Sequence, residues 1–312
     1  MNRVTQLLGI QYPIVQGAMQ EVATAELAAA VANGGGLGII AAGGKTAEEV
    51  RAAIKKARTL TDKPFAVNLM LMDPNTPAIV KVIIDEKVPI VTTGAGTPKN
   101  YMADLKAANI KVLPVVPNVK IAKKMEALGC DAVIAEGMEG GGHIGTLTSQ
   151  VLWPQIADAV SIPLIAAGGI GDGRGMVSAM VAGAEGVQCG TLFSIAQESP
   201  VGDQWRQAVV EATDSSTVVV GSTIRDASRM LMNHKAEALS ALEAQPVSRE
   251  AFNDAMSVGL RSAVYEDDAT DGVIFSGAVA GLIKEAKPAA AVIQQLMTEA
   301  EAIINHQKIE LS

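Results

Sequence analysis

Aromatic and basic residues are scarce in this chain of 312 residues. It has four Phe, two Trp and three Tyr, and its 25 basic residues are outnumbered by 33 acidic ones, which gives a net charge of −8. An acidic chain argues against nucleic acid or an anionic membrane as a main partner. With so few aromatic side chains, any bound ligand would be held mostly by backbone, small residues and aliphatic side chains.

Long apolar runs and clustered cysteines are also missing. No stretch reaches the roughly 18 apolar residues of a membrane span, and the first 20 residues lack a basic head followed by an apolar run, so we expect no secretory signal. The two cysteines, Cys130 and Cys189, lie far apart in apolar segments and form no metal-binding spacing. We therefore predict a cytoplasmic protein with inert core cysteines.

Glycine and short apolar runs are plentiful. Apolar residue types make up 49% of the chain, there are 30 glycines, and eight short apolar runs recur about every 25 residues. Runs of this kind, bounded by turn residues, are typical of fully buried parallel strands. The predicted strands are Pro13–Gln16, Leu37–Ile40, Pro64–Leu69, Pro89–Thr92, Lys111–Val115, Asp131–Ala135, Pro163–Ala167 and Gly186–Gln188.

Helical patterns fill the gaps between these runs, and several have marked starts. Thr46 with Glu49 forms a capping-box pattern, Thr76 and Thr97 each precede a proline, and Asn118 precedes a helix that we expect Gly129 to end. Eight strand–helix units predict an α/β fold, a (β/α)₈ TIM barrel. An open, doubly wound sheet has the same alternation, so spacing alone does not separate the two.

The alternation stops after Phe193. We predict that residues 1–198 and 259–312 form the barrel with C-terminal helices, and that residues 199–258 form a smaller cap, mainly helical and without clear buried strands, inserted after strand eight and lying over the barrel mouth. Two more helices are expected, over Phe252–Tyr265 and Ile274–Ile304, the second interrupted near Pro288.

Glycines follow the last two predicted strands. Because the chemistry of such barrels lies at the C-terminal ends of the strands, Gly168, Gly169 and Gly190 could direct backbone N–H groups at a phosphate, together with the Thr191 hydroxyl. The alternative is that these glycines only form tight turns.

Two polar residues interrupt or end buried strands. Asn68 could bind the edge of a heterocyclic ring, or be a hydrogen-bonded core amide. Glu136 could bind a ligand hydroxyl or ring edge, or only orient the loop that follows it. For each of these two residues, the sequence is compatible with both the ligand-binding and the structural role.

His143 is the main catalytic candidate. It lies among glycines after the sixth strand, where the backbone can approach a ligand closely and an imidazole can donate a hydrogen bond or move a proton near pH 7. A purely structural histidine is the alternative. His234 and His306 lie in polar helical segments and are expected to face solvent. No second His or Cys stands at metal-ligand spacing, so a catalytic metal is unsupported.

Several of these motifs together resemble a known family. In chain order they are 14–19 (IVQGAM), 35–40 (GGLGII), 61–65 (TDKPF) with Asn68, 92–96 (TTGAG), 136–145 (EGMEGGGHIG) and 166–170 (AAGGI). They resemble the FMN-dependent enoyl-acyl-carrier-protein reductases II of bacterial fatty-acid synthesis. Nitronate monooxygenases share the barrel and several motifs, but the Glu-Gly-Met-Glu form of the histidine loop favours the reductase branch. The resemblance reaches Phe193, is looser through the cap, and returns near Asp271 and Ala280.

The resemblance implies a role for each matching residue. Gly17, Ala18 and Met19 would line the flavin, Asn68 and Glu136 would contact its ring or ribityl chain, and Gly141, Gly142 and His143 would face the isoalloxazine and the nicotinamide. Gly168, Gly169, Gly190 and Thr191 would hold the FMN phosphate, with help from Gln188. The family also implies NADH or NADPH as co-substrate and a monovalent cation, whose ligands the sequence does not indicate.

The chain departs from the family pattern in three places. Ala18 stands where glycine is frequent, Leu192 where arginine is common, and Ala278 follows Gly277 where glutamine is usual. The third change removes a side-chain amide that would contact the ring or a loop. The divergent cap leaves the acyl-chain preference open.

The expected activity is reduction of a trans-2-enoyl thioester, carried on acyl carrier protein or CoA, in the last step of fatty-acid elongation. Nitronate oxidation with FMN and O₂ is the first alternative; a flavin-free phosphate-binding lyase or isomerase and a non-catalytic flavin-binding protein are the others. The family suggests a homodimer. Because acyl carrier protein is acidic, we expect it to dock on the cap near Arg225, Arg229 and Lys235.

Overall fold

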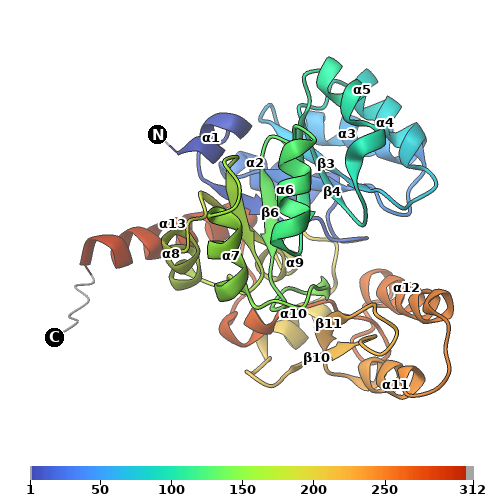
Figure 1. Ribbon diagram of the computed structural model, residues 1–312. Coiled ribbons are helices and arrows are strands. Elements are labelled where there is room, and N and C mark those ends of the chain that lie inside the picture. Colours follow the sequence, from blue (N-terminus) through green and yellow to red (C-terminus); the bar gives the residue numbers. More distant parts are fainter. Residues whose placement is uncertain (1, 307–312) are drawn as a thin grey trace.

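Eight parallel strands form the body of the molecule. The computed structural model describes residues 2–306, and Figure 1 shows the strands and their helices above a smaller cap. The strands are β1 (Ile14–Gln16), β2 (Gly38–Ala41), β3 (Phe65–Met70), β4 (Ile90–Gly94), β5 (Lys111–Val116), β6 (Val133–Glu136), β8 (Leu164–Ala167) and β9 (Gly186–Cys189), in the spatial order β1-β9-β8-β6-β5-β4-β3-β2. All eight predicted strands are confirmed.

The two ends of this sheet meet and close a barrel. The Gln16 N–H donates to the Leu37 carbonyl and the Leu37 N–H to the Ile14 carbonyl, each at 2.9 Å, while the Gln16 side chain accepts from the Ile39 N–H at 2.9 Å. The sheet is therefore a (β/α)₈ TIM barrel and not an open doubly wound sheet.

Helices surround the barrel. They are α2 (Ala25–Asn33), α3 (Ala47–Leu60), α4 (Thr76–Asp85), α5 (Met102–Ala107) after the short turn η1 (Pro98–Asn100), α6 (Val119–Ala127), α7 (Ser149–Ala157) and α8 (Gly173–Val181). Only the four-residue α9 (Thr191–Ser194) follows β9 directly. The last helix, α13 (Ala289–His306), packs against α2 and α8 and completes the ring after the cap.

The predicted helix starts are largely confirmed. Thr46 and Glu49 form a reciprocal capping box at α3, and the Asn118 side chain accepts from the Ile121 N–H at the start of α6. Helix α4 differs by one residue, because Asn75 is its N-cap and the Thr76 hydroxyl donates instead to the Met70 carbonyl at 2.8 Å.

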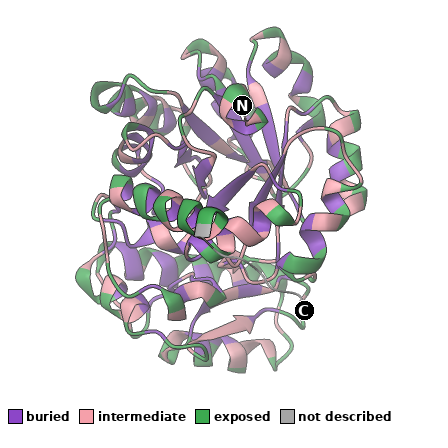
Figure 2. Ribbon diagram, turned by 90° about the vertical axis from the view of Figure 1, so that its left-hand side faces the viewer, coloured by how far each residue is buried: buried purple, intermediate pink, exposed green. Residues whose placement is uncertain are grey.

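The strands are buried on both faces, as Figure 2 shows. One apolar cluster fills the barrel interior, and Val4 and Leu8 of α1 (Arg3–Leu8) belong to it. A larger apolar cluster lies between the strands and the surrounding helices. Cys130 and Cys189 are both buried and unpaired, as expected for core cysteines.

The cap contains strands that we did not predict from the sequence. It comprises α10 (Asp203–Val210), β10 (Thr217–Val220), β11 (Ser228–Leu231), α11 (His234–Glu243) and α12 (Arg249–Tyr265). Strands β10 and β11 pair antiparallel, and β11 also pairs with the short β7 (Gly142–His143) of the barrel. The expectation of a cap without strands is therefore wrong. The β-branched run Thr217–Val220 was the available signal.

The segment after α12 also differs from expectation. Residues 274–287 do not continue a helix: the Leu231 N–H donates to the Ile274 carbonyl at 2.9 Å beside β11, and a 3₁₀ turn, η2 (Ala278–Leu282), follows. Helix α12 runs through residue 258, where we predicted the cap to end, and the cap's apolar cluster extends to Ile283. Within residues 2–306, no helix has the length and apolarity needed to cross a membrane.

Candidate active site

A cavity of about 1290 Å³ lies between the C-terminal ends of the strands and the cap. All of the site residues predicted from the sequence line it: Gly17, Ala18, Met19, Asn68, Glu136, Gly141, Gly142, His143, Gly168, Gly169, Gln188, Gly190 and Thr191. Its volume exceeds that of a typical single-ligand pocket, so it has room for a flavin and part of a second ligand.

The ends of β8 and β9 form a glycine-lined wall of this cavity. Gly168 and Gly169 have φ values of 86° and 77°, and a Cβ on Gly168 would lie 2.8 Å from the Gly137 carbonyl oxygen. Close backbone packing therefore requires glycine at position 168, as the tight-turn alternative expects. A Cβ on Gly190 would instead meet no atom within 4 Å. The backbone at Gly190, where the short α9 begins, therefore lies beside open space in the cavity. Backbone N–H groups in such a place are suited to binding a phosphate.

Three polar side chains face the same cavity. Gln188 is 8% exposed, and no described residue hydrogen-bonds to its side chain. The Asn68 amide donates to the Thr92 hydroxyl at 3.0 Å, which leaves its carbonyl oxygen available. Glu136 has no hydrogen-bond partner among the described residues, and burial raises the pKa of its carboxyl group to about 7.

These features fit FMN. The Glu136 carboxyl and the Gln188 amide face the cavity without a protein partner among the described residues, so both are free to pair with polar atoms of a ligand. The glycine wall supplies phosphate donors, and Gly17, Ala18 and Met19 supply a mostly apolar part of the cavity lining. Within residues 2–306 no group of three or more His, Cys, Asp or Glu side chains could hold a metal ion.

His143 lies on β7 at the seam between barrel and cap. Its side chain is 58% exposed, and that surface borders the cavity. The ring centroid lies 6.4 Å from that of Phe275, and Nε2 lies 3.7 Å from Asp226 Oδ1. Burial lowers the pKa of His143, Asp226 acts in the opposite direction, and Arg249 lowers it further. The imidazole is thus held toward its neutral form.

Three cap residues in this region were missed by sequence reasoning. Asp226, Arg249 and Asn253 line the cavity beside His143. Asp226 accepts hydrogen bonds at 2.7 Å from both Arg249 Nη2 and Asn253 Nδ2. No sequence signal marks them, because the residues belong to a loop and a helix that only the fold brings to the barrel mouth.

The loop that carries His143 is fixed on both sides. The Glu139 carboxylate accepts from the N–H of Ser149 at 2.9 Å and from its hydroxyl at 2.7 Å, at the start of α7. The Glu139 carbonyl accepts from the Ala278 N–H at 2.9 Å, and a Cβ on Gly141 would lie 2.8 Å from the Gly277 nitrogen. Close backbone packing therefore requires glycine here, while Ala278, at the family's glutamine position, is exposed.

The predicted docking residues are not equivalent. Arg229 is half-buried and faces the histidine loop, since its Nε donates to the Met138 carbonyl at 3.2 Å and its Nη1 to the Thr217 hydroxyl at 3.0 Å. Burial lowers the pKa of its guanidinium. Arg229 is therefore not a free surface charge, in contrast to the exposed Arg225, whereas Lys235 is partly exposed.

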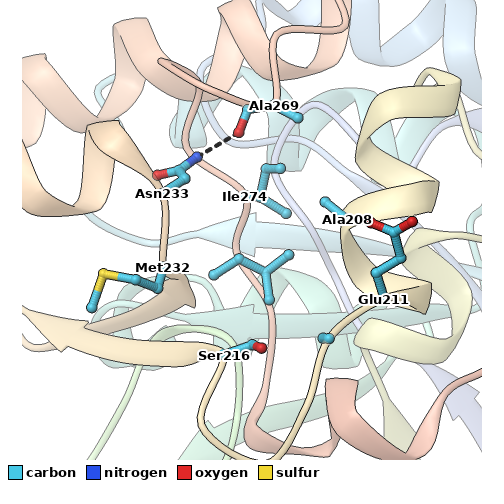
Figure 3. A pocket seen from close by; sticks show the side chains of 9 residues that line it. Ala208, Glu211, Ser216, Met232, Asn233, Ala269 and Ile274 are labelled. Carbon is cyan, nitrogen blue, oxygen red and sulfur yellow. Dashed lines mark hydrogen bonds between the residues drawn. The ribbon is translucent and has the colours of Figure 1, made fainter.

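Other candidates lie away from the cavity. His234 is at the surface, where its Nδ1 lies 2.5 Å from Asp271 Oδ1, as expected for a solvent-facing residue. His306 is the last residue of α13, and its side chain lies outside the described part. A second cavity of about 220 Å³ lies within the cap (Figure 3), and none of the predicted site residues lines it; its lining includes Ala208, Glu211, Ser216, Met232, Asn233, Ala269 and Ile274.

Comparison with known proteins identifies the family. The family model described as nitronate monooxygenase matches residues 1–79 and 77–299. The chain belongs to the nitronate monooxygenase family. Among solved structures, FabK from Thermotoga maritima is 43% identical to this chain, with a TM-score of 0.94 and 97% of each chain covered. The resemblance noted from the sequence is therefore confirmed.

Curated relatives carry two different names. A probable nitronate monooxygenase from Staphylococcus aureus is 34% identical over 288 residues, 78% of this chain and 81% of that protein. A bicyclic carboxyl-CoA dehydrogenase from Rhodococcus jostii is 44% identical over 200 residues, 64% of this chain but only 57% of that protein's length. Family membership implies a flavin-dependent oxidoreductase, without naming the substrate.

Proposed function

We propose that the chain is an FMN-dependent oxidoreductase that reduces trans-2-enoyl thioesters of acyl carrier protein or CoA with NADH or NADPH. The observation that carries the proposal is the match to FabK, an enoyl-acyl-carrier-protein reductase II, over 97% of both chains. The cavity, which gathers every residue that the reductase resemblance implies, supports the same function.

The chain's own residues would bind and orient the cofactor. The backbone at Gly169 and Gly190 would hold the phosphate, while Gln188, Asn68 and Glu136 would pair with polar edges of the ring and ribityl chain. When bound, FMN would carry a hydride from the nicotinamide to the β-carbon of the enoyl thioester. A Glu136 carboxyl that is partly protonated near neutral pH can donate as well as accept.

His143 would act on the thioester. Negative charge develops on the thioester oxygen as the β-carbon gains a hydride, and a donor aimed at that oxygen lowers the barrier. A proton must also reach the α-carbon. The imidazole borders the cavity and can serve either step, as a hydrogen-bond donor or as the source of the proton.

Two relatives support a thioester substrate. The Rhodococcus jostii protein and its 41% identical counterpart from Mycobacterium tuberculosis are named for a carboxyl-CoA substrate. The second match covers 62% of that protein's length, so this likeness supports the thioester and not the ring system.

Anaerobic flavin spectroscopy tests the proposal. The purified protein should be yellow, bleach with NADH or NADPH, and regain its colour when crotonyl thioester is added. Titration with each nucleotide in turn identifies the donor. A well-folded, colourless protein that takes up no FMN would overturn the proposal and favour a flavin-free lyase or isomerase. A yellow protein inert to both nucleotides would favour a non-catalytic flavin protein.

Nitronate oxidation is the second candidate function. It is favoured by the family model itself and by the Staphylococcus aureus relative, which spans most of this chain. Oxygen uptake with propyl nitronate and no nicotinamide, measured beside enoyl-thioester reduction, separates the two. Faster nitronate turnover would reverse the order of the candidates.

Three further parts of the proposal concern partners and ions. Acyl carrier protein would dock on the cap near Arg225 and Lys235, the chain would form a homodimer, and a monovalent cation would support activity. Turnover in potassium, sodium and tetramethylammonium salts tests the cation, and light scattering of the holoenzyme measures the oligomeric state.

A further inference from the structure

A buried carboxylate beside His143 is shared between two positively chargeable groups. Asp226 is 4% exposed in its side chain, and its Oδ1 lies 2.7 Å from Arg249 Nη2 and 3.7 Å from His143 Nε2. Its Oδ2 accepts from Asn253 Nδ2 at 2.7 Å. One carboxylate oxygen therefore faces both the histidine of the barrel loop and the arginine of the cap helix.

The carboxylate is held in place by its surroundings. The Asp226 N–H donates to the Gly221 carbonyl at 2.9 Å, and Gly221 has φ +79° with its hypothetical Cβ only 2.5 Å from the Asp226 carbonyl oxygen. Arg249 and Asn253 lie one turn apart on α12. Burial raises the pKa of Asp226, but the hydrogen bonds from Arg249 and Asn253 outweigh it and leave the pKa below its usual value.

Opposing charges act on His143. Asp226 favours the imidazolium form, whereas burial and Arg249 disfavour it. The uncharged Phe275 ring lies 6.4 Å from the imidazole, centroid to centroid. Glu136, Glu139 and Glu250 also line the cavity. Because Arg249 is hydrogen-bonded to Asp226, it offsets part of the carboxylate's attraction for the imidazole proton.

We infer that Asp226 and Arg249 act on His143 as an opposed pair: the carboxylate oxygen attracts the imidazole proton from 3.7 Å, and the arginine hydrogen-bonded to that oxygen offsets the attraction. The consequence for the reaction rests on the proposed function: the balance between the two side chains sets how readily His143 gives up a proton or donates a hydrogen bond to the thioester. Arg249 would then set the pH range of activity although it is 56% exposed at the cavity mouth.

Histidine NMR tests the inference without any turnover. The C2–H resonances of histidine-labelled holoenzyme are followed against pH, and His143 is identified by its loss in His143→Gln. In Asp226→Asn the pKa of His143 should fall by about one unit, because the attracting charge is gone and Arg249 remains. In Arg249→Gln it should rise, because Asp226 is no longer neutralised.

Two control variants distinguish these shifts in the pKa of His143 from effects of partial unfolding. His234, paired with Asp271 at the surface, should titrate unchanged in both variants and shift down only in Asp271→Asn. Arg58→Gln removes a partly exposed, ion-paired arginine on α3 and should leave His143 unchanged. Because Arg249 is exposed, Arg249→Gln should fold even if Asp226→Asn does not.

Opposite shifts of the His143 titration in the two variants support the inference. Shifts in the same direction, or no shift in Arg249→Gln, would overturn it. The acid limb of kcat/KM should move with the NMR value in each variant. If the NMR shifts appear but no enoyl reductase activity is found, the proposed function fails and the charge sharing stands.

Discussion

His143 and Ser228 are directly paired residues of two antiparallel strands, β7 from the barrel and β11 from the cap. The catalytic candidate is thus held by a strand that begins in a different part of the chain. The neighbouring pair, Gly142 with Arg229, continues this ladder, and the Ile144 N–H donates to the Ala227 carbonyl at 2.9 Å. Because the cap positions the histidine, changes in the cap should affect the chemistry as well as substrate access.

Replacing His143 by Ala should leave FMN bound and reduce enoyl-thioester turnover by about 100-fold or more, the usual loss when a general acid or hydrogen-bond donor is removed. Flavin absorbance and steady-state rates measure the two effects on one sample. His234→Ala, which removes a surface histidine, is the control. Wild-type turnover in His143→Ala would remove this residue from the mechanism.

Gly190→Ala should weaken FMN binding by about tenfold, or roughly 1.4 kcal/mol, with little loss of stability. The added methyl group meets no protein atom within 4 Å, so it should obstruct the phosphate and not the fold. Flavin fluorescence titration of the flavin-free protein measures the affinity. Gly129→Ala, equally free of neighbours but outside the cavity lining, should bind FMN normally, although its φ of 84° makes the added side chain cost some stability. Equal affinity in the two variants would contradict the assigned phosphate site.

Glu136 should make the flavin-free protein less stable as pH rises. Burial raises its folded-state pKa to about 7, against 4.5 in the unfolded chain. Between these values the folded protein keeps a proton that the unfolded chain has released, so stability falls from about pH 5 to pH 7 and stays reduced above.

Glu136→Gln should therefore gain about 1–3 kcal/mol over the wild type at pH 8 and much less at pH 5. Urea unfolding at both pH values measures the difference. Glu301→Gln, which changes an exposed carboxylate on α13, should show none. A gain for Glu136→Gln of the same size at both pH values would argue against a protonated Glu136 carboxyl in the folded protein.

Arg229 and Arg225 should respond differently to substitution. Arg229→Ala removes hydrogen bonds to Met138 and Thr217 and should cost about 1–3 kcal/mol of stability together with activity. Arg225→Gln changes an exposed side chain and should stay within about 0.5 kcal/mol of the wild type. Thermal unfolding checks both. If carrier protein docks on the cap, only Arg225→Gln should raise KM for the carrier-bound substrate while sparing the CoA substrate.

Much of the barrel and its ligand-facing residues could be predicted from the sequence. Short apolar runs alternate with capped helices, and parallel strands point their C-terminal ends to one side. Asn68, Glu136, Gln188 and Gly190 therefore face one cavity because each lies at or near the end of its strand. The position of each residue within its strand is enough to predict that it lies at this end of the barrel, because all eight strands of such a barrel run in the same direction.

Only the tertiary structure decided which distant segments meet. Closure of the barrel depends on contacts between β1 and β2, the eighth outer helix is α13 and arrives after the cap, and β11 supplies the partner of β7. The pairing of Asp226 with Arg249 beside His143 joins three elements with no shared periodicity. Such contacts depend on how whole helices and strands pack against one another. The hydrophobic pattern of a single segment shows only which of its own residues are buried, so it does not identify the segments that it will contact.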